Sequence, residues 1–434
     1  MNCKKYPDWR TCLLALPLVL LSCSSSKIFR SAKRELLTDK TIHAAHIGIS
    51  VYDVNSAKFI FDHQGDQYFV PASNTKIPSC YAAMKYLGDS LSAFKYVRRG
   101  NDTIIIEGTG SPDLLHPDFK QQNAFNFLKQ FRHIVFSTRF YSEFLGSGWA
   151  WNDYKDYYMA QRSEFPVYGN IATFKSNSDG TIDIIPSYFR RSIQPNGQLK
   201  YKDGFSVEKT FDANVFSLAQ GAAKIVEVPF SPKIEDVAAM LADTLKVSVE
   251  MSLLKLEMPA QEFKSRPVDS VLTRMMHRSD NFFAEQMLLM VSKTVEGVLN
   301  DRAAIDLLLK TDLASLPQKP RWVDGSGLSR YNLFTPRDFV TILDKMRSEF
   351  GMERIKTIFP TGGEGTISSY YQEEKGQIFA KTGTLSGVVA LSGYLYTKKG
   401  KLLLFSVLVN NHNGSATDVR KAVEKFLRKT RNIN

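Results

Sequence analysis

Cysteine and long apolar runs are scarce in this sequence. Four of its 434 residues are cysteine, and the apolar run near its start, Leu13–Leu21, has nine residues. Nine residues of α-helix rise about 14 Å, whereas the hydrocarbon core of a bilayer is about 30 Å thick. A membrane-spanning helix is therefore excluded there. The basic residues that precede the run, Lys4, Lys5 and Arg10, predict a secretory signal instead.

The string LLSC, which ends at Cys23, resembles a bacterial lipoprotein processing site. By that resemblance residues 1–22 are a lipoprotein signal peptide, Cys23 carries the lipid, and residues 23–30 are a tether. The alternative is a plain cleaved signal with an incidental cysteine. Cys80 then has no disulfide partner in the mature chain. We expect an exported protein of the cell envelope, held to a membrane by its lipid and facing the periplasm.

Acidic residues are outnumbered, with 44 Asp and Glu against 56 Lys and Arg and a net charge of +12. The basic residues are scattered rather than clustered, so no nucleic-acid partner is predicted. The anionic partners of an exported protein are lipid head groups and cell-wall polymers. The seven histidines lack zinc-ligand spacings such as His-Glu-x-x-His. We expect neither a metal nor another cofactor.

Strand patterns stand at both ends of the chain, with helical patterns between them. Residues 46–64 alternate as a hairpin, and three strand-like segments fill residues 376–411 before a closing helix at 415–430. The pattern predicts an α+β fold in which an antiparallel sheet flanked by helices unites residues 31–100 and 261–434. Residues 101–260, rich in aromatics and short strand-like segments, are expected to be a large inserted β-rich module.

Ser73 stands three residues before Lys76 in the string PASNTKIPSC. Residues three apart share one face of a helix, so the amine can reach the hydroxyl. A serine nucleophile needs such a base, and lysine serves only when its pKa is lowered by burial or by a second cation. The alternative is an ordinary helix start with a solvated lysine, because the spacing recurs elsewhere in the chain. Pro78 follows closely and can kink the helix.

Two further strings supply polar groups of the same kind. In KTGT, Lys381 is the candidate second cation, and Thr382 and Thr384 alternate with Gly383, so a strand places both hydroxyls on one face. Gly383 has no side chain and allows a substrate backbone to approach closely. The alternative is a strand-end turn.

The string SDN contains Ser279 and Asn281 between two helical patterns. A junction between two helices can present a hydroxyl and an amide to one cleft. The alternative for this string is an N-cap on the second helix.

Together and in this order, Ser-x-x-Lys, Ser-Asp-Asn and Lys-Thr-Gly resemble the penicillin-recognising serine enzymes. Within that class the chain resembles the D-alanyl-D-alanine carboxypeptidases of the penicillin-binding protein 4 family. Stretches such as VDGSGLSRYN, GWAWNDYKDYY and PTGGEGTI carry the resemblance. The interval from Ser73 to Ser279, 206 residues (279 − 73), leaves room for the large insertion of this family. Class A β-lactamases have a far shorter interval there.

The resemblance implies a role for each residue around the attack. Ser73 attacks the carbonyl between two terminal D-alanines, and Lys76 takes its proton. The backbone N–H groups of Ser73 and Thr384 form the oxyanion hole. Ser279 relays a proton to the departing D-alanine.

The remaining polar groups are expected to bind the substrate. Lys381, Thr382 and Thr384, with Gly383 between the threonines, hold the carboxylate of the departing D-alanine. Asn281 binds an amide of the substrate.

The expected substrates are peptidoglycan stem peptides that end in D-Ala-D-Ala and crosslinks that contain D-alanine, cut through an acyl-enzyme. Carboxypeptidase and endopeptidase activities use the same chemistry, and β-lactams are expected to inhibit by acylating Ser73. Two alternatives remain open: a peptidoglycan-binding scaffold with little turnover, and a β-lactamase. A pure binder has no need for both lysines, which favours the enzyme.

Overall fold

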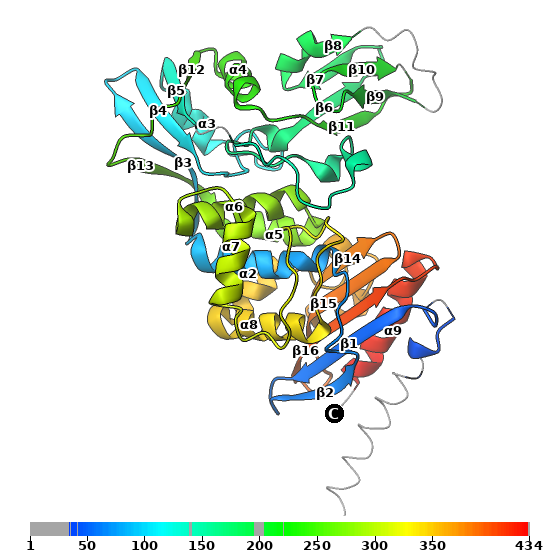
Figure 1. The fold of residues 1–434 in the computed structure, drawn as a ribbon. Helices are drawn as coiled ribbons and strands as arrows, with labels where there is room; N and C mark the ends of the chain where they lie inside the picture. The colour runs from blue at the N-terminus through cyan, green and yellow to red at the C-terminus, as the bar shows by residue number, and fades with distance from the viewer. Residues whose placement is uncertain are drawn as a thin grey trace, which may run out of the picture.

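The computed structural model describes residue 34 and residues 36–40, 42–138, 141–194, 204–219 and 221–432. The predicted signal peptide, the tether and Cys23 all lie outside these residues. The described chain forms two bodies, one above the other in Figure 1. The lower body contains both ends of the described chain, and the upper body contains its middle. In the ranges given, no helix is long and apolar enough to cross a membrane.

The lower body is built on a five-stranded sheet with the order β14-β15-β16-β1-β2, in which all neighbours are antiparallel. The predicted hairpin and the three predicted C-terminal strands are all present, and the predicted α+β architecture is confirmed. The strands are β1 (His46–Asp53), β2 (Lys58–His63), β14 (Ile378–Leu385), β15 (Val388–Tyr396) and β16 (Leu402–Asn410).

Helices cover both faces of this sheet (Figure 1). On one face Leu404 and Leu408 of β16 share a core with α8, and on the other Phe405 and Val407 share a core with α9. Because both faces are buried, β16 is almost continuously apolar rather than alternating. The helices are α2 (Lys76–Tyr86), α5 (Val268–Arg278), α6 (Asn281–Glu296), α7 (Asp301–Lys310), α8 (Pro336–Ile358) and α9 (Ala416–Arg431).

The upper body is rich in strands, as predicted for the insertion. It contains a five-stranded sheet of order β12-β5-β4-β3-β13 and, within the described residues, two three-stranded sheets of orders β8-β10-β9 and β11-β6-β7. Buried aromatic side chains such as Phe94, Phe136 and Phe174 fill its core. Its helices are α3 (Asn123–Leu128) and α4 (Ile234–Leu245). Its strands are β3 (Ser90–Arg99), β4 (Thr103–Gly108), β5 (His133–Ser137), β6 (Ile171–Ser176), β7 (Ile182–Ile185), β8 (Ile193–Gln194), β9 (Ser206–Lys209), β10 (Phe216–Ala219), β11 (Ile225–Pro229), β12 (Ser248–Ser252) and β13 (Gln261–Pro267).

The five-stranded sheet of the upper body crosses both expected domain boundaries. Its strand β3 lies before residue 101 and its strand β13 lies after residue 260, yet they pair with each other and belong to this sheet rather than to the lower one. We therefore propose that the insertion comprises residues 89–267 and that the chain passes between the bodies just before β3 and just after β13.

Candidate active site

Ser73 and Lys76 lie on consecutive turns of the chain. Ala72–Thr75 forms a single 3-10 turn, and α2 begins at Lys76. The Lys76 amine is 3.0 Å from the Ser73 hydroxyl oxygen. Pro78 is the third residue of α2, where a backbone N–H has no partner within the helix. The proline therefore does not displace Lys76.

Three oxygen atoms surround the Lys76 amine. Besides Ser73, they are Asn281 Oδ1 at 2.6 Å and the Ser326 carbonyl oxygen at 2.7 Å. A neutral amine has two N–H donors and one lone pair, and the amide and carbonyl oxygens can only accept hydrogen bonds. Asn281 and Ser326 therefore take the two N–H groups of neutral Lys76, and its lone pair faces the Ser73 hydroxyl.

Burial favours the neutral form of Lys76, and nearby negative charges partly oppose this effect. The Lys76 side chain is fully buried, and this desolvation lowers its pKa to about 8, against the opposing charges of Asp324, Asp280 and Glu285. Ser73 is only partly buried, so its hydroxyl is accessible, whereas the Lys76 amine is shielded from water.

Asn281 makes two contacts within the protein that the sequence does not predict. Its Oδ1 accepts from Lys76, and its Nδ2 donates to the backbone oxygen of Tyr158 in the upper body at 2.8 Å. Both ends of the amide are therefore engaged by the protein, which fixes the direction of Oδ1. One N–H of Nδ2 is still available for a substrate amide.

Lys381 lies next to the other predicted serine. Its amine donates to Ser279 Oγ at 2.8 Å and to the Thr382 carbonyl at 2.8 Å. Burial and the charge of Lys76 hold the pKa of Lys381 well below its usual value. Ser279 ends α5 in a left-handed conformation, with φ of 59°. The two serine–lysine pairs thus stand close enough for one amine to influence the other.

The two threonines of β14 project from the same face of the strand, as the alternation predicts. Lys381 and Gly383 are buried, whereas Thr382 is half-buried and Thr384 is exposed. Thr382 donates to Thr366 Oγ1 at 2.7 Å. Arg420 of α9 donates to Thr384 Oγ1 at 2.7 Å and brings a cation to the edge of the sheet.

Gly383 is constrained by a close approach within the protein. A Cβ atom at this position would lie 2.7 Å from the Pro71 carbonyl oxygen and 3.1 Å from the Ser73 backbone nitrogen. The glycine therefore allows the turn with the nucleophile to pack on β14, whereas the sequence pattern suggested an approaching substrate.

Sequence reasoning did not single out two residues that contact the site. Ser326 supplies a carbonyl to Lys76, and Arg420 supplies a cation near Thr384. Ser326 lies in the string VDGSGLSRYN, whose resemblance drew attention to the segment but not to its contact. Arg420 has no comparable signal, because it is one of many cations in an amphipathic helix.

The fold and this cluster of two serines and two buried lysines define a penicillin-recognising serine enzyme. The family model for the D-Ala-D-Ala carboxypeptidase 3 (S13) family matches residues 31–430. The chain belongs to this family.

Two curated relatives resemble almost the whole chain. The D-alanyl-D-alanine carboxypeptidase DacB of Haemophilus influenzae is 25% identical over 454 residues, which cover 92% of this chain and 92% of the relative. A D-alanyl-D-alanine carboxypeptidase of Actinomadura sp. is 24% identical, over 92% of this chain and 86% of the relative.

Solved structures share the fold. The crystal structure of penicillin binding protein 4 (dacB) from Haemophilus influenzae has a TM-score of 0.73 at 21% identity and covers 93% of this chain and 98% of its own. A predatory peptidoglycan endopeptidase from Bdellovibrio bacteriovorus, Bd3459, has a TM-score of 0.53 at 15% identity, over 89% and 92% of the two chains.

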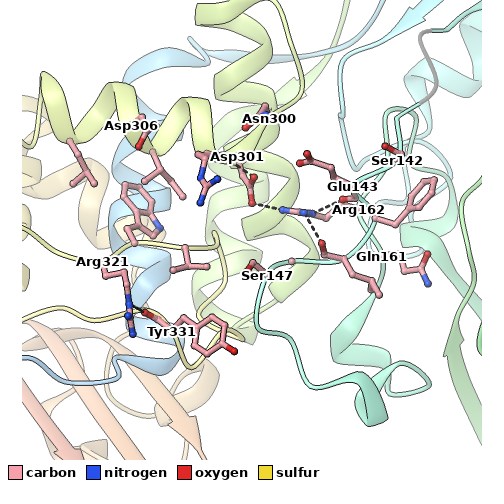
Figure 2. Close-up of a pocket in the computed structure, with 18 of the residues that line it drawn as sticks. Ser142, Glu143, Ser147, Gln161, Arg162, Asn300, Asp301, Asp306, Arg321 and Tyr331 are labelled. Carbon is pink, nitrogen blue, oxygen red and sulfur yellow. Dashed lines mark hydrogen bonds and ion pairs between the residues drawn. The ribbon is translucent and has the colours of Figure 1, made fainter.

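A large cavity lies apart from this chemistry. It has a volume of about 1120 Å³ and opens between the upper body, α7 and residues 319–331 (Figure 2). Ser73, Lys76 and Lys381 are not among its lining residues. Arg162 of the upper body and Asp301 of α7 meet in its wall, which makes the cavity a boundary of the catalytic region rather than its centre.

Proposed function

We propose that this D-Ala-D-Ala carboxypeptidase uses Ser73 as its nucleophile and Lys76 as the base that activates it. The observation that carries the proposal is the 3.0 Å contact between the two side chains, together with the two acceptors that fix the N–H groups of Lys76. The amine of Lys76 then has its lone pair directed at the proton it must remove.

The reaction proceeds through an acyl-enzyme. Ser73 Oγ bonds to the carbonyl carbon before the terminal D-alanine while its proton passes to Lys76. Ser279 passes a proton to the departing nitrogen as the C–N bond breaks and D-alanine leaves, and the proton that Lys76 took replaces it, so Lys76 is neutral again. Water then attacks the ester and restores the Ser73 hydroxyl. The backbone N–H groups of Ser73 and Thr384 stabilise the oxyanion in both steps, a contribution of about 10²–10³ in rate per donor.

The departing carboxylate binds at the end of β14. Lys381, Thr382 and Thr384 hold it, and Arg420 contributes a further positive charge from α9. An anion beside Lys381 raises the pKa of that amine. Once charged, Lys381 opposes a positive charge on nearby Lys76, so substrate binding favours the neutral base.

The substrates are stem peptides that end in D-Ala-D-Ala, and crosslinks in which a D-alanine carbonyl is joined to the next peptide. β14 is an edge strand of its sheet, and an edge strand can pair with an extended peptide. We also propose that Cys23 is lipidated and tethers the enzyme to a membrane in the cell envelope. Cys23→Ala should then move the full-length protein from the membrane fraction to the soluble fraction.

The deciding experiment compares the mature protein with Ser73→Ala and Lys76→Arg. Ser73→Ala removes the hydroxyl, and the guanidinium of Lys76→Arg stays charged at all accessible pH values. Both variants should therefore lose D-alanine release from a D-Ala-D-Ala peptide and acylation by a labelled penicillin. Lys85→Arg, on the exposed side of the same helix, is the matched control and should behave as the wild type.

The two alternatives give different outcomes in the same assay. A scaffold would trap the penicillin label yet release no D-alanine from peptide or muropeptide. A β-lactamase would hydrolyse the drug rapidly. Either result would refute the proposed peptidase, as would full activity in Ser73→Ala.

A further inference from the structure

Both acceptors that orient Lys76 are held by groups outside the three sequence motifs. Asn281 is fixed by the Tyr158 carbonyl of the upper body. The Ser326 carbonyl belongs to a loop that contacts two buried carboxylates. The groups that hold these two acceptors therefore determine the direction of the Lys76 lone pair.

The two carboxylates accept hydrogen bonds from backbone N–H groups on either side of the Ser326 carbonyl. Glu285 Oε1 accepts from the Ser326 backbone N–H at 2.7 Å, and Asp324 Oδ1 accepts from the Gly327 N–H at 2.8 Å. The peptide unit that donates to Asp324 is the one whose carbonyl accepts from Lys76. Both carboxylates are fully buried, and neither touches Ser73 or the expected substrate.

Glu285 is also linked to the upper body through Arg162. Arg162 is 2% exposed, and its guanidinium forms an ion pair with Asp301 and lies 3.6 Å from Glu285 Oε2. Figure 2 shows Arg162 between Asp301 and Glu143, on the wall of the cavity. Glu285 Oε2 has no hydrogen-bond partner among the described residues, so the charge of Arg162 is its main support.

We propose that Glu285 is a positioning residue for Lys76, acting through the Ser326 peptide, and that Arg162 makes this role depend on the upper body. The inference rests on the proposed function, because it requires Lys76 to be the base.

The charge of Glu285 should also affect the pH dependence, in addition to the effect of its hydrogen bond to Ser326. Burial and the nearby Asp324 raise the pKa of Glu285 to about 7, against the charge of Arg162. Ionised Glu285 in turn raises the pKa of Lys76. Removal of the negative charge should therefore lower the pKa of Lys76. The charged or titratable groups that face Glu285 are Arg162 and Tyr141 from the upper body, Asp301 from α7, Asp324 from the loop and Lys76 from α2.

The test measures the rate of penicillin acylation against pH for Glu285→Gln and Glu285→Ala. Glutamine keeps an oxygen acceptor for Ser326, so its plateau rate should stay within about threefold of the wild type. The rising limb of its profile should move down by about one pH unit, the effect of losing one nearby charge at an effective dielectric constant near 20. Alanine removes the acceptor and should lower the plateau by at least about tenfold.

A second comparison tests the link to the upper body. In an Arg162→Gln background, Glu285→Gln should shift the limb by less than half as much, because an unsupported Glu285 is already protonated. Arg266→Gln is the matched control. It removes another arginine, half-buried and paired with Asp113 at 2.9 Å, and should leave the Glu285→Gln shift intact.

Three results would overturn the inference. They are a rising limb that stays in place in Glu285→Gln, equal losses of plateau acylation rate in the glutamine and alanine variants, and a wild-type plateau rate in the alanine variant. Rates are taken per folded site, counted by the final extent of labelling, so a poorly folding alanine variant leaves the near-isosteric glutamine variant decisive. Failure of the proposed function is separate, because it would appear as acylation that persists in Ser73→Ala.

Discussion

At the scale of single residues, the properties of Lys76, the proposed base, follow from its surroundings. Desolvation lowers the pKa of Lys76 to about 8, and the nearby carboxylates keep it from falling further. The amine is thus mostly charged at neutral pH, and in its neutral form its N–H groups are directed at Asn281 and Ser326. Little rearrangement is required before proton transfer.

Acylation should rise with pH on this account. Only neutral Lys76 can accept the Ser73 proton, so below pH 8 the rate should increase about tenfold per pH unit and level off above the pKa. The rate constant for penicillin acylation, measured from pH 5.5 to 9.5 with Lys85→Arg as the control, checks the sign. A rate that falls with rising pH over this range would contradict a neutral lysine base.

The sequence identifies the local part of this site and misses the distant part. Ser73 and Lys76 are three residues apart, so their contact follows from helical geometry alone. The contact of Lys76 with the Ser326 carbonyl joins residues 250 positions apart and uses a backbone atom that every residue possesses. No residue type or spacing can signal such a contact. For the same reason Glu285, one acidic residue within an apolar helix, gives no hint of its position.

At the scale of elements, two backbone conformations of high energy flank the chemistry. Ala72, directly before Ser73, and Ser279 both have positive φ, at 47° and 59°. Such conformations cost about 1–2 kcal/mol in residues other than glycine. The surrounding packing maintains them, which is common where a side chain must be presented at a fixed angle.

Ser279→Gly and Ser279→Ala should separate strain from chemistry. Both variants lose the hydroxyl that contacts Lys381 and should lower D-alanine release by about 10²–10⁴. The glycine variant tolerates positive φ and should be the more stable of the two by about 1 kcal/mol. Urea unfolding of the pair gives the difference directly. Equal stabilities would indicate that α5 ends differently in the folded protein.

Gly383→Ala should affect the nucleophile turn directly. The added methyl group meets the Pro71 carbonyl and the Ser73 nitrogen, both backbone atoms that cannot rotate away. We expect a loss of about 1–3 kcal/mol in the free energy of unfolding and at least a tenfold lower acylation rate. Gly400→Ala is the control, because nothing lies within 4 Å of the added atom and only its φ of 78° is unfavourable. Unchanged acylation in Gly383→Ala would show that β14 does not support Ser73.

The sequence predicts individual strands better than it predicts which strands pair with each other. The hairpin β1–β2 and the three C-terminal strands are visible in the alternation of the sequence because each involves neighbouring segments. The pairing of β3 with β13 brings together strands that begin at residues 90 and 261. Their patterns alone do not reveal which sheet they join, so the sequence predicts domain boundaries that fall inside that sheet.

At the scale of the whole molecule, the upper body supports the lower one through buried polar contacts. Trp149 Nε1 donates to Asp324 Oδ2 at 3.0 Å, across the junction between the two bodies. Asp324 accepts three other hydrogen bonds, from Gly327, Ser329 and Asn332. This full set of donors offsets the cost of burying a carboxylate.

Trp149→Phe should therefore weaken the junction. It removes one donor from a buried charge, and we expect a loss of about 1.5–3 kcal/mol in the free energy of unfolding together with slower acylation. Trp151→Phe is the control from the same segment, since Trp151 is 73% exposed, and should change neither quantity. Equal unfolding midpoints for the two variants would rule out a supporting role for the indole.

The position of β1 has a consequence for the newly made chain. This strand lies between β2 and β16, and His46 pairs with Asn410, 364 residues later (410 − 46). The sheet cannot close until nearly all of the polypeptide is available. Until its last strand has been made, the growing chain therefore has no finished catalytic centre and cannot cut bonds in the wall.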